Sequence, residues 1–421
     1  MDEQSDVKAA VNVPEKPGAP AAPTSLAPPT TKMIQAMLAA AKGTSDLIFS
    51  PGRPPQVELN GELRPVTFPG LTVLTPDDTK RIAADLMGRS EYARRKLEQE
   101  GSADISYSLP GLARFRVNIF RQRGTFATVM RVIPMGVPNF ATLKLPAALG
   151  DCASLRNGIV LVTGPTGSGK SSTLAAILDK INLEKAYHIV TIEDPIEFLH
   201  PHKRSTIHQR ELYSDTPTFA LALRAALRQA PKVILVGEMR DRETIEIALE
   251  AAETGHLVFS TLHTVDAPKT VERIVGVFPL ADQQVIRNRL ARSFRYIISQ
   301  RLVPRKDGTG RAAAVEILKS TMRTREYVEK GESEGKSLLD AMRDGETEGM
   351  QCFDDEIEKF VRAGIVDFET GLAYSTNEGN LRLALADMAE SGSHSAQEPA
   401  RPAPPSPAPA KQEDAQIEII R

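Results

Sequence analysis

A glycine-rich segment with a single lysine is the most specific chemical pattern in the sequence. Residues 164–171 are Gly-Pro-Thr-Gly-Ser-Gly-Lys-Ser, which fits the pattern G-x-x-x-x-G-K-S/T between an apolar run and a helical stretch. Glycines let backbone N–H groups converge on a phosphate, and the helix N-terminus adds its positive end. Lys170 would reach the β- and γ-phosphate oxygens, and the Ser171 hydroxyl would hold Mg²⁺. The expected phosphate-binding residues are Gly164, Pro165, Thr166, Gly167, Ser168, Gly169, Lys170, Ser171 and Ser172.

Two other apolar runs end in acidic residues. Glu193 follows the apolar residues of segment 189–195, and Glu238 follows those of segment 232–241. In a parallel sheet, acids at the carboxyl ends of strands face the ligand crevice. Hydrolysis needs one carboxylate to position or deprotonate water and another to bind the metal. We predict these two roles for Glu238 and Glu193, against the alternative that both are surface acids near the next helix.

Histidines flank a further apolar run. His256 and His263 bracket residues 257–262, and they are two of only seven histidines in the chain. Isolated histidines would be interpreted as structural, but beside a phosphate loop they would also suit sensing of a γ-phosphate, and the residues leave both interpretations open. The sequence contains no Asn-Lys-x-Asp segment of the kind that reads guanine. This favours ATP over GTP as the nucleotide.

The apolar runs predict the elements that must position these groups. Residues 158–162, 188–192 and 233–236 are strand-like and are separated by helical stretches, which is typical of a parallel α/β sheet. We predict a P-loop ATPase domain over residues 150–320 and a helical section over residues 321–388.

Upstream, a smaller α+β domain is expected over residues 31–145. Residues 76–99, with Thr75 as the N-cap, predict one charged helix. Residues 113–120 and 125–132 alternate apolar and polar side chains across Gln122-Arg123-Gly124, which predicts a hairpin. The two ends of the chain, residues 1–30 and 389–421, are rich in proline and alanine and poor in periodic apolar residues, so we expect them to be disordered.

Composition excludes several classes of protein. A chain of 421 residues is too long for one ordinary domain. The net charge of −2 argues against a protein that mainly binds nucleic acid, and two cysteines are too few for a four-cysteine zinc site. The acidic start has no apolar stretch behind it, and no run approaches the roughly 18 apolar residues of a membrane span. We therefore expect a cytoplasmic protein.

Over residues 31–388 these segments resemble the PilT/PilU group of type IV pilus retraction ATPases, within the secretion ATPase superfamily. Residues 164–171 match its Walker A motif, 191–195 its Asp box, 234–241 its Walker B motif and 254–264 its His box. The resemblance implies a homohexameric ring, with a PAS-like N-terminal domain and a RecA-like ATPase domain. It also implies a motor that hydrolyses ATP at the cytoplasmic face of the inner membrane and extracts pilin through a platform protein there.

The resemblance also implies roles for six residues. Arg116 and Arg131 match arginines that reach the γ-phosphate, although by themselves they would be interpreted as two exposed arginines on a hairpin. The other matches are the catalytic glutamate Glu238, the Asp-box acid Glu193 and the His-box pair, His256 and His263.

Some segments depart from the family pattern and leave the subtype open. Gly237 stands where many P-loop enzymes carry aspartate, as is usual in this family. Residues 323–327 lack the Ala-Ile-Arg-Asn-Leu box of PilT and place charge there, and residues 349–354 look like PilU, whereas residues 264–270 look like PilT. We therefore hypothesise an accessory, PilU-like motor that needs a PilT-type ATPase in the same cell. The alternatives are a Dot/Icm-type secretion ATPase and a ring subunit whose own hydrolysis is dispensable. A pilus-extension ATPase is disfavoured, because such proteins usually carry a four-cysteine zinc module and this chain has only two cysteines.

Overall fold

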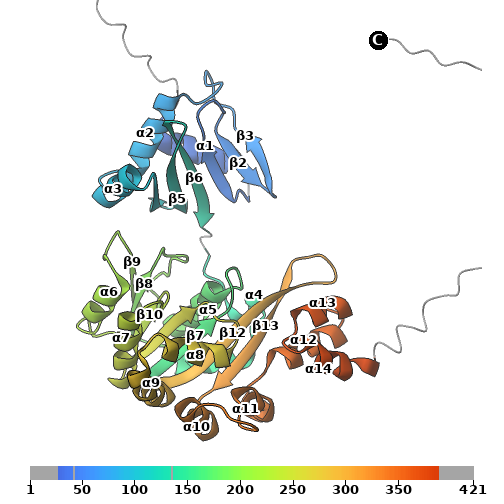
Figure 1. The fold of residues 1–421 in the computed structure, drawn as a ribbon. Helices are drawn as coiled ribbons and strands as arrows, with labels where there is room; N and C mark the ends of the chain where they lie inside the picture. The colour runs from blue at the N-terminus through green and yellow to red at the C-terminus, as the bar shows by residue number, and fades with distance from the viewer. Residues whose placement is uncertain (1–26, 41–42, 134–135, 388–421) are drawn as a thin grey trace, which may run out of the picture. The chain divides into compact units, whose positions relative to one another are not determined.

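The structure is a computed structural model that describes residues 27–40, 43–133 and 136–387 (Figure 1). These residues form two separate β-sheets with their covering helices, one before and one after residues 134–135. Most of the two tails for which we predict disorder lies outside the described residues. No helix in the described part of the chain is long and apolar enough to cross a membrane.

The first sheet has six antiparallel strands in the order β3-β2-β1-β6-β5-β4. The predicted hairpin is confirmed as β5 and β6, which are joined by Arg123 and Gly124 with φ values of 47° and 76°. Two residues with positive φ between paired strands are typical of a type I′ turn. The strands are β1 (Asp46–Phe49), β2 (Gln56–Leu59), β3 (Glu62–Pro65), β4 (Ser102–Leu109), β5 (Ala113–Gln122) and β6 (Thr125–Ile133).

Alternation along β5 decides which face of this sheet is buried. Phe115, Val117 and Ile119 are fully buried, whereas Arg116 between them is exposed. The buried face joins a core that includes residues of the helices α1 (Thr30–Ala40) and α2 (Pro76–Met87). The opposite face of the sheet therefore carries the polar and charged side chains of the hairpin.

The charged helix predicted over residues 76–99 is two helices. Thr75 caps α2 as expected, since its side chain accepts the Asp78 N–H at 3.1 Å and the Asp78 carboxylate accepts the Thr75 N–H at 2.9 Å. However, α2 ends at Gly88, whose φ is 52°, and Ser90 then caps α3 (Glu91–Gln99). A glycine with positive φ, followed by a new N-cap residue, ends one helix and starts another.

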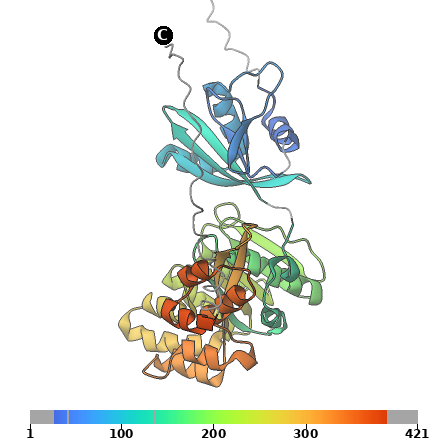
Figure 2. The ribbon, with the colours of Figure 1, turned by 90° about the vertical axis from the view of Figure 1, so that its right-hand side faces the viewer.

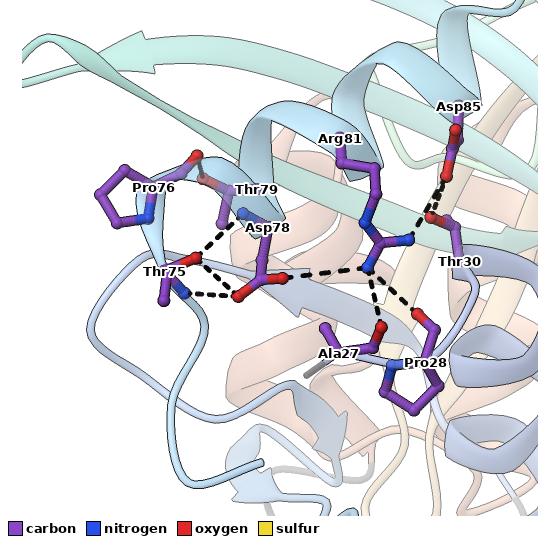
Figure 3. A network of polar contacts seen from close by, with 9 residues as sticks. All are labelled: Ala27, Pro28, Thr30, Thr75, Pro76, Asp78, Thr79, Arg81 and Asp85. Carbon is purple, nitrogen blue, oxygen red and sulfur yellow. Dashed lines mark hydrogen bonds and ion pairs between the residues drawn. The ribbon is translucent and has the colours of Figure 1, made fainter. Parts of the chain in front are cut away.

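A polar network fastens the segment before α1 to α2 (Figure 3). The Arg81 guanidinium donates to the carbonyl oxygens of Ala27 and Pro28 at 3.2 and 3.1 Å. The Thr30 hydroxyl donates to the Asp85 carboxylate at 2.6 Å. These bonds fix the start of α1 against a helix that lies about 50 residues later in the sequence.

The second sheet has seven strands in the order β13-β12-β7-β11-β10-β8-β9. β12 pairs with β7, β10 with β11 and β8, and β8 with β9, all in parallel, whereas β13 is antiparallel to β12. The predicted α/β fold with a parallel sheet is confirmed. The strands are β7 (Gly158–Thr163), β8 (His188–Glu193), β9 (Thr206–Glu211), β10 (Val233–Val236), β11 (Leu257–Leu262), β12 (Phe294–Pro304) and β13 (Arg311–Lys319).

Helical crossovers connect strands of this sheet, as parallel pairing requires. α5 joins β7 to β8, and α7 joins β10 to β11. The carboxyl ends of these strands therefore meet at one edge of the sheet. The helices between the strands are α5 (Lys170–Glu184), α6 (Phe219–Ala226), α7 (Arg242–Glu253), α8 (Ala267–Gly276) and α9 (Leu280–Ser293), after a short α4 (Phe140–Leu143) and a 3₁₀ helix (Ala147–Ser154).

Helices occupy most of the chain after β13. Phe353, Ile357 and Leu372 form a common core with Val303 of β12 and Ala314 of β13. Figures 1 and 2 show α12 to α14 as one compact group, coloured orange to red. The helices are α10 (Met322–Lys330), α11 (Leu338–Asp344), α12 (Phe353–Arg362), α13 (Phe368–Tyr374) and α14 (Glu378–Ala384).

The segment that replaces the Ala-Ile-Arg-Asn-Leu box lies on α10. Thr324 is fully buried and Tyr327 is only 8% exposed, so two of its five positions pack inside the subunit. Arg323 is more exposed, pairs with Asp344 at 2.6 Å and donates to the Tyr327 hydroxyl at 2.9 Å. Because a helix turns only some of five successive residues outward, the charge that this segment places on the surface is carried by Arg323, Arg325 and Glu326.

Candidate nucleotide-binding and catalytic site

The glycine-rich loop lies between β7 and α5. Gly164, Gly167 and Gly169 have φ values of 144°, 77° and 91°, a region that favours glycine. A Cβ on Gly164 would lie 2.5 Å from the Gln300 carbonyl oxygen, which belongs to β12. The loop thus starts under close contact with the sheet, and only glycine fits at its first position.

Lys170 is the first residue of α5 and is 8% exposed. Its Nζ donates to the carbonyl oxygens of Gly164 and Pro165 at 2.9 and 3.1 Å. These bonds hold the ammonium group within the loop, at the N-terminal end of a 15-residue helix. A positive charge and a helix N-terminus at one place favour an anion.

The loop also meets two structural conditions for holding a phosphate. No atom lies within 4 Å of where a Cβ on Gly167 or Gly169 would be, so space is open over the loop. The buried Ser168 hydroxyl has no hydrogen-bond partner among the described residues, and phosphate oxygens can accept a hydrogen bond from it. Ser171 and Ser172 follow in the first turn of α5 and are partly exposed. A nucleotide phosphate therefore fits the residues present.

Glu193 is the last residue of β8. Its Oε1 accepts hydrogen bonds from the Thr191 hydroxyl at 2.6 Å and from the Gln209 side-chain amide at 3.1 Å. Burial raises the pKa of this carboxyl to about 7, although both hydrogen bonds favour the charged form. A divalent cation nearby would stabilise the carboxylate and lower that pKa again.

Thr191 and Gln209 were not predicted as site residues. Thr191 lies two residues before Glu193 on one strand, so its position on the same face was available from the alternation of a strand. Gln209 lies on β9, opposite Thr191 in the register, and only the pairing of β8 with β9 reveals it.

Glu238 follows β10 and lies beside Glu193 in the strand order. β10 and β8 are neighbours, with Val236 opposite Ile192, so the structure brings these two predicted carboxylates to adjacent strand ends. The Glu238 side chain is 14% exposed and pairs with Arg240 at 2.6 Å. A partly buried carboxylate that keeps a cation on one side is able to accept a proton from water on the other.

Gly237 explains the departure from the usual aspartate. Its N–H donates to the Ile192 carbonyl oxygen at 2.7 Å. A Cβ on Gly237 would lie 3.2 Å from that oxygen and 3.4 Å from the Glu193 Cα. The close approach of β10 to β8 leaves little room for a side chain between the two carboxylates.

The two predicted histidines lie at opposite ends of β11. His263 is exposed and follows the carboxyl end of the strand, on the side of the phosphate loop. His256 precedes the strand, and its Nδ1 contacts the Ala251 carbonyl oxygen at 3.0 Å. Six residues of strand correspond to about 20 Å. The structure therefore does not bring His256 together with the phosphate loop of its own subunit.

Arg116 and Arg131 lie directly opposite each other on β5 and β6, so their side chains share one face of the first sheet. Both are exposed, Arg131 by 71% of its side chain. The Arg131 Nε pairs with Asp46 at 3.0 Å. Two positive charges opposite each other repel. An anion bound between Arg116 and Arg131 would therefore relieve this repulsion.

Comparisons with known proteins identify the family of the chain. A family model described as "Type II/IV secretion system protein" matches residues 56–400. The chain is 43% identical over 333 residues to the type IV pilus retraction ATPase PilT of Pseudomonas aeruginosa, covering 78% of this chain and 94% of that one. It is 38% identical over 350 residues to the type IV pilus ATPase PilU of the same organism, covering 83% and 90%.

Two solved structures show the same fold. The crystal structure of the pilus retraction motor PilT with bound ADP superposes with a TM-score of 0.75 at 41% identity, covering 84% of this chain and 98% of that one. The ATPase DotB of Legionella pneumophila superposes with a TM-score of 0.71 at 29% identity, covering 87% and 98%.

Proposed function

Because the chain belongs to the type II/IV secretion system protein family, we propose that it hydrolyses ATP to power the retraction of a type IV pilus. The resemblance to PilT and PilU that the sequence predicts is confirmed, as is the fold of an N-terminal domain with a RecA-like ATPase domain. The observation that carries the proposal is the Lys170 loop on the same sheet edge as the carboxylates Glu193 and Glu238.

In the proposed reaction, the loop binds the phosphates and Glu238 acts on water. The Lys170 ammonium and the backbone N–H groups of residues 164–171 neutralise the β- and γ-phosphates. Glu238 orients a water molecule and accepts its proton as the water attacks the γ-phosphorus, while the bond between the γ-phosphorus and the bridging oxygen breaks and ADP leaves. Ser171 and Glu193 would hold Mg²⁺, directly or through water, and the ion would neutralise charge on the phosphates.

The remaining predicted residues act at the γ-phosphate in this proposal. His263 is placed after β11, where it would report the presence of the γ-phosphate. Arg116 and Arg131 would stabilise the transferred phosphoryl group of a neighbouring subunit, as arginine fingers do. His256 is proposed only for a contact outside this site. A homohexamer is the assembly that we propose, because it supplies each site with a neighbour's arginines.

The proposed partners and location follow from the same assignment. We propose that the ring works at the cytoplasmic face of the inner membrane, on a platform protein of the pilus, with no direct contact to nucleic acid. The domain boundaries that we propose are 31–145, 150–320 and 321–388. A Dot/Icm-type function is less favoured, because the PilT structure shares 41% of residues with this chain and DotB shares 29%.

The sequence similarity does not separate a primary from an accessory motor, at 43% identity to PilT and 38% to PilU. We keep the accessory role as the proposal, on the charged residues Arg323, Arg325 and Glu326 of α10. Twitching of a strain that lacks every other retraction ATPase tests it. Full motility restored by this chain alone would make it the primary motor.

The decisive experiment on activity compares two variants of the full chain. Lys170→Ala should weaken nucleotide binding itself, because it removes the charge within the loop. Glu238→Gln should bind Mg-ATP with nearly normal affinity and lose most hydrolysis, since the loop binds phosphate independently of the base. Nucleotide titrations and phosphate-release assays measure the two effects separately. Wild-type turnover in Glu238→Gln would remove this residue from its proposed role.

A further inference from the structure

Three buried polar side chains form a row across β7, β12 and β13. Thr163, the last residue of β7, lies opposite Ser299 of β12, and Ser299 lies opposite Glu316 of β13. Opposed residues on neighbouring strands share one face of the sheet. All three are at most 2% exposed. Polar groups at this depth are unfavourable unless they are hydrogen-bonded, so we expect these three side chains to bond to one another or to the backbone.

Hydrogen bonds connect the row in one direction. The Thr163 hydroxyl donates to the Ser299 Oγ at 3.1 Å, and the Ser299 hydroxyl donates to the Glu316 carboxylate. An ionised carboxylate only accepts, so it fixes the direction of both bonds. Thr163 immediately precedes Gly164, and therefore this relay starts at the base of the phosphate loop.

The other end of the relay reaches a second loop. The Glu316 Oε1 accepts the N–H of Ala267 at 2.8 Å. Ala267 is the first residue of α8, directly after its N-cap Asp266, and it lies four residues after His263. Glu316 is thus hydrogen-bonded directly to the segment that leaves β11, and it is linked through Ser299 to Thr163 of the strand that leads into the phosphate loop.

Opposing effects act on the pKa of the Glu316 carboxyl. Burial raises its pKa to about 7, and the nearby Asp266 adds to this rise, whereas the Ala267 N–H, Ser299 and Arg301 lower it. The carboxylate accepts hydrogen bonds from both Ser299 and Ala267. An amide at position 316 would turn an N–H towards one of these two donors.

We infer that Glu316 is a positioning residue for hydrolysis, which holds the phosphate loop in register with the His263 segment through Ser299 and Thr163. This inference rests on the proposed ATPase function. Lys170 and the loop backbone still bind phosphate when the relay is broken. Loss of the relay therefore displaces groups in the transition state while it leaves nucleotide affinity largely unchanged.

Three single variants of the full-length protein break the relay in different ways. Ser299→Ala removes its central hydroxyl, and Thr163→Val removes the first hydroxyl and keeps the branched shape. Glu316→Gln replaces one accepting oxygen with an N–H donor. Each should lower kcat by about 10-fold or more, since small displacements near reacting groups are costly, and KM for ATP should change less than about 3-fold. The Ser299→Ala/Glu316→Gln double variant should be no slower than the slower single variant, because both act through one chain of bonds.

Ser293→Ala is the matched control. Ser293 is also buried in this part of the fold, just before β12, and its hydroxyl has no hydrogen-bond partner among the described residues. This variant should retain the kcat of the wild type. Melting temperatures are measured for all variants, so that a loss of stability is seen separately from a loss of turnover.

The possible outcomes separate this inference from the proposed function. If the wild type hydrolyses ATP no faster than Lys170→Ala, the proposed function itself fails. If the wild type is active and the three relay variants keep its kcat, the relay has no role. If KM rises, the melting temperature falls and the loss of kcat matches the loss of folded protein, then Glu316 is a purely structural residue. This result would also overturn the inference.

Discussion

Replacing Gly164 with alanine should deform the phosphate loop from its first residue. The φ of Gly164 is 144°, and an added Cβ would lie 2.5 Å from both the Gln300 carbonyl oxygen and the Ser168 Oγ. The serine hydroxyl can rotate away, but the carbonyl belongs to the backbone of β12. Because β12 is paired on both sides, the loop must move instead of the strand.

The size of the effect follows from two contributions. A left-handed backbone costs a residue other than glycine roughly 1–2 kcal/mol, and overpacking of a well-packed site costs about 1–3 kcal/mol. The sum is about 2–5 kcal/mol if the loop keeps its position. Movement of the loop relieves part of this cost, but it also displaces the Gly164 carbonyl that holds the Lys170 ammonium at 2.9 Å. We expect nucleotide affinity to fall by about 10-fold or more, which corresponds to about 1.4 kcal/mol.

The assay is a titration with fluorescent ADP together with a thermal melt. Gly310→Ala is the matched control, because Gly310 has a φ of 102° and no atom within 4 Å of the added Cβ. The control shares the backbone strain without the steric conflict. Both variants should melt at a lower temperature, and only Gly164→Ala should lose affinity. Wild-type affinity in folded Gly164→Ala protein would refute the steric reasoning.

Three further predictions concern stability and assembly. Burial raises the pKa of Glu193 from 4.5 to about 7, so between these values the folded protein binds more protons than the unfolded chain. The free energy of unfolding should then fall by up to about 3 kcal/mol as pH rises through this window, and Glu193→Gln should flatten that part of the slope in urea titrations. Arg131→Ala subunits mixed with Glu238→Gln subunits should regain partial ATPase activity, because some interfaces then pair an intact arginine with an intact glutamate; no recovery in well-exchanged rings would contradict a site shared between subunits. Arg81→Ala removes the bonds to the carbonyls of Ala27 and Pro28, so hydrogen exchange in α1 should become faster by a factor that corresponds to about 1–3 kcal/mol, with nucleotide affinity unchanged.

Local patterns in the sequence were sufficient for the elements that carry the phosphate site. Apolar runs at 158–162, 188–192 and 233–236 become β7, β8 and β10 within one residue of the predicted ends. The turn Arg123-Gly124 sets the register of the β5–β6 hairpin. Each of these features depends on neighbouring residues only, because strand formation and tight turns follow from side-chain alternation and backbone freedom over a few positions. The prediction of one charged helix over residues 76–99 was wrong because it followed the charged residues and overlooked Gly88, where the first helix ends.

Contacts between distant segments were decided by the tertiary structure alone. Spacing in the sequence places His256 and His263 close together, yet the extended strand between them separates them by about 20 Å. The raised pKa of Glu193, the lack of room at Gly237 and the relay from Thr163 to Glu316 all depend on which strands are neighbours and in what register. Strand order in a parallel sheet is set by the packing of crossovers between segments far apart in the chain. The sequence therefore identifies Glu193 by its place at the end of a strand. Its pKa and its hydrogen-bond partners are determined only when the strands of the sheet pack together.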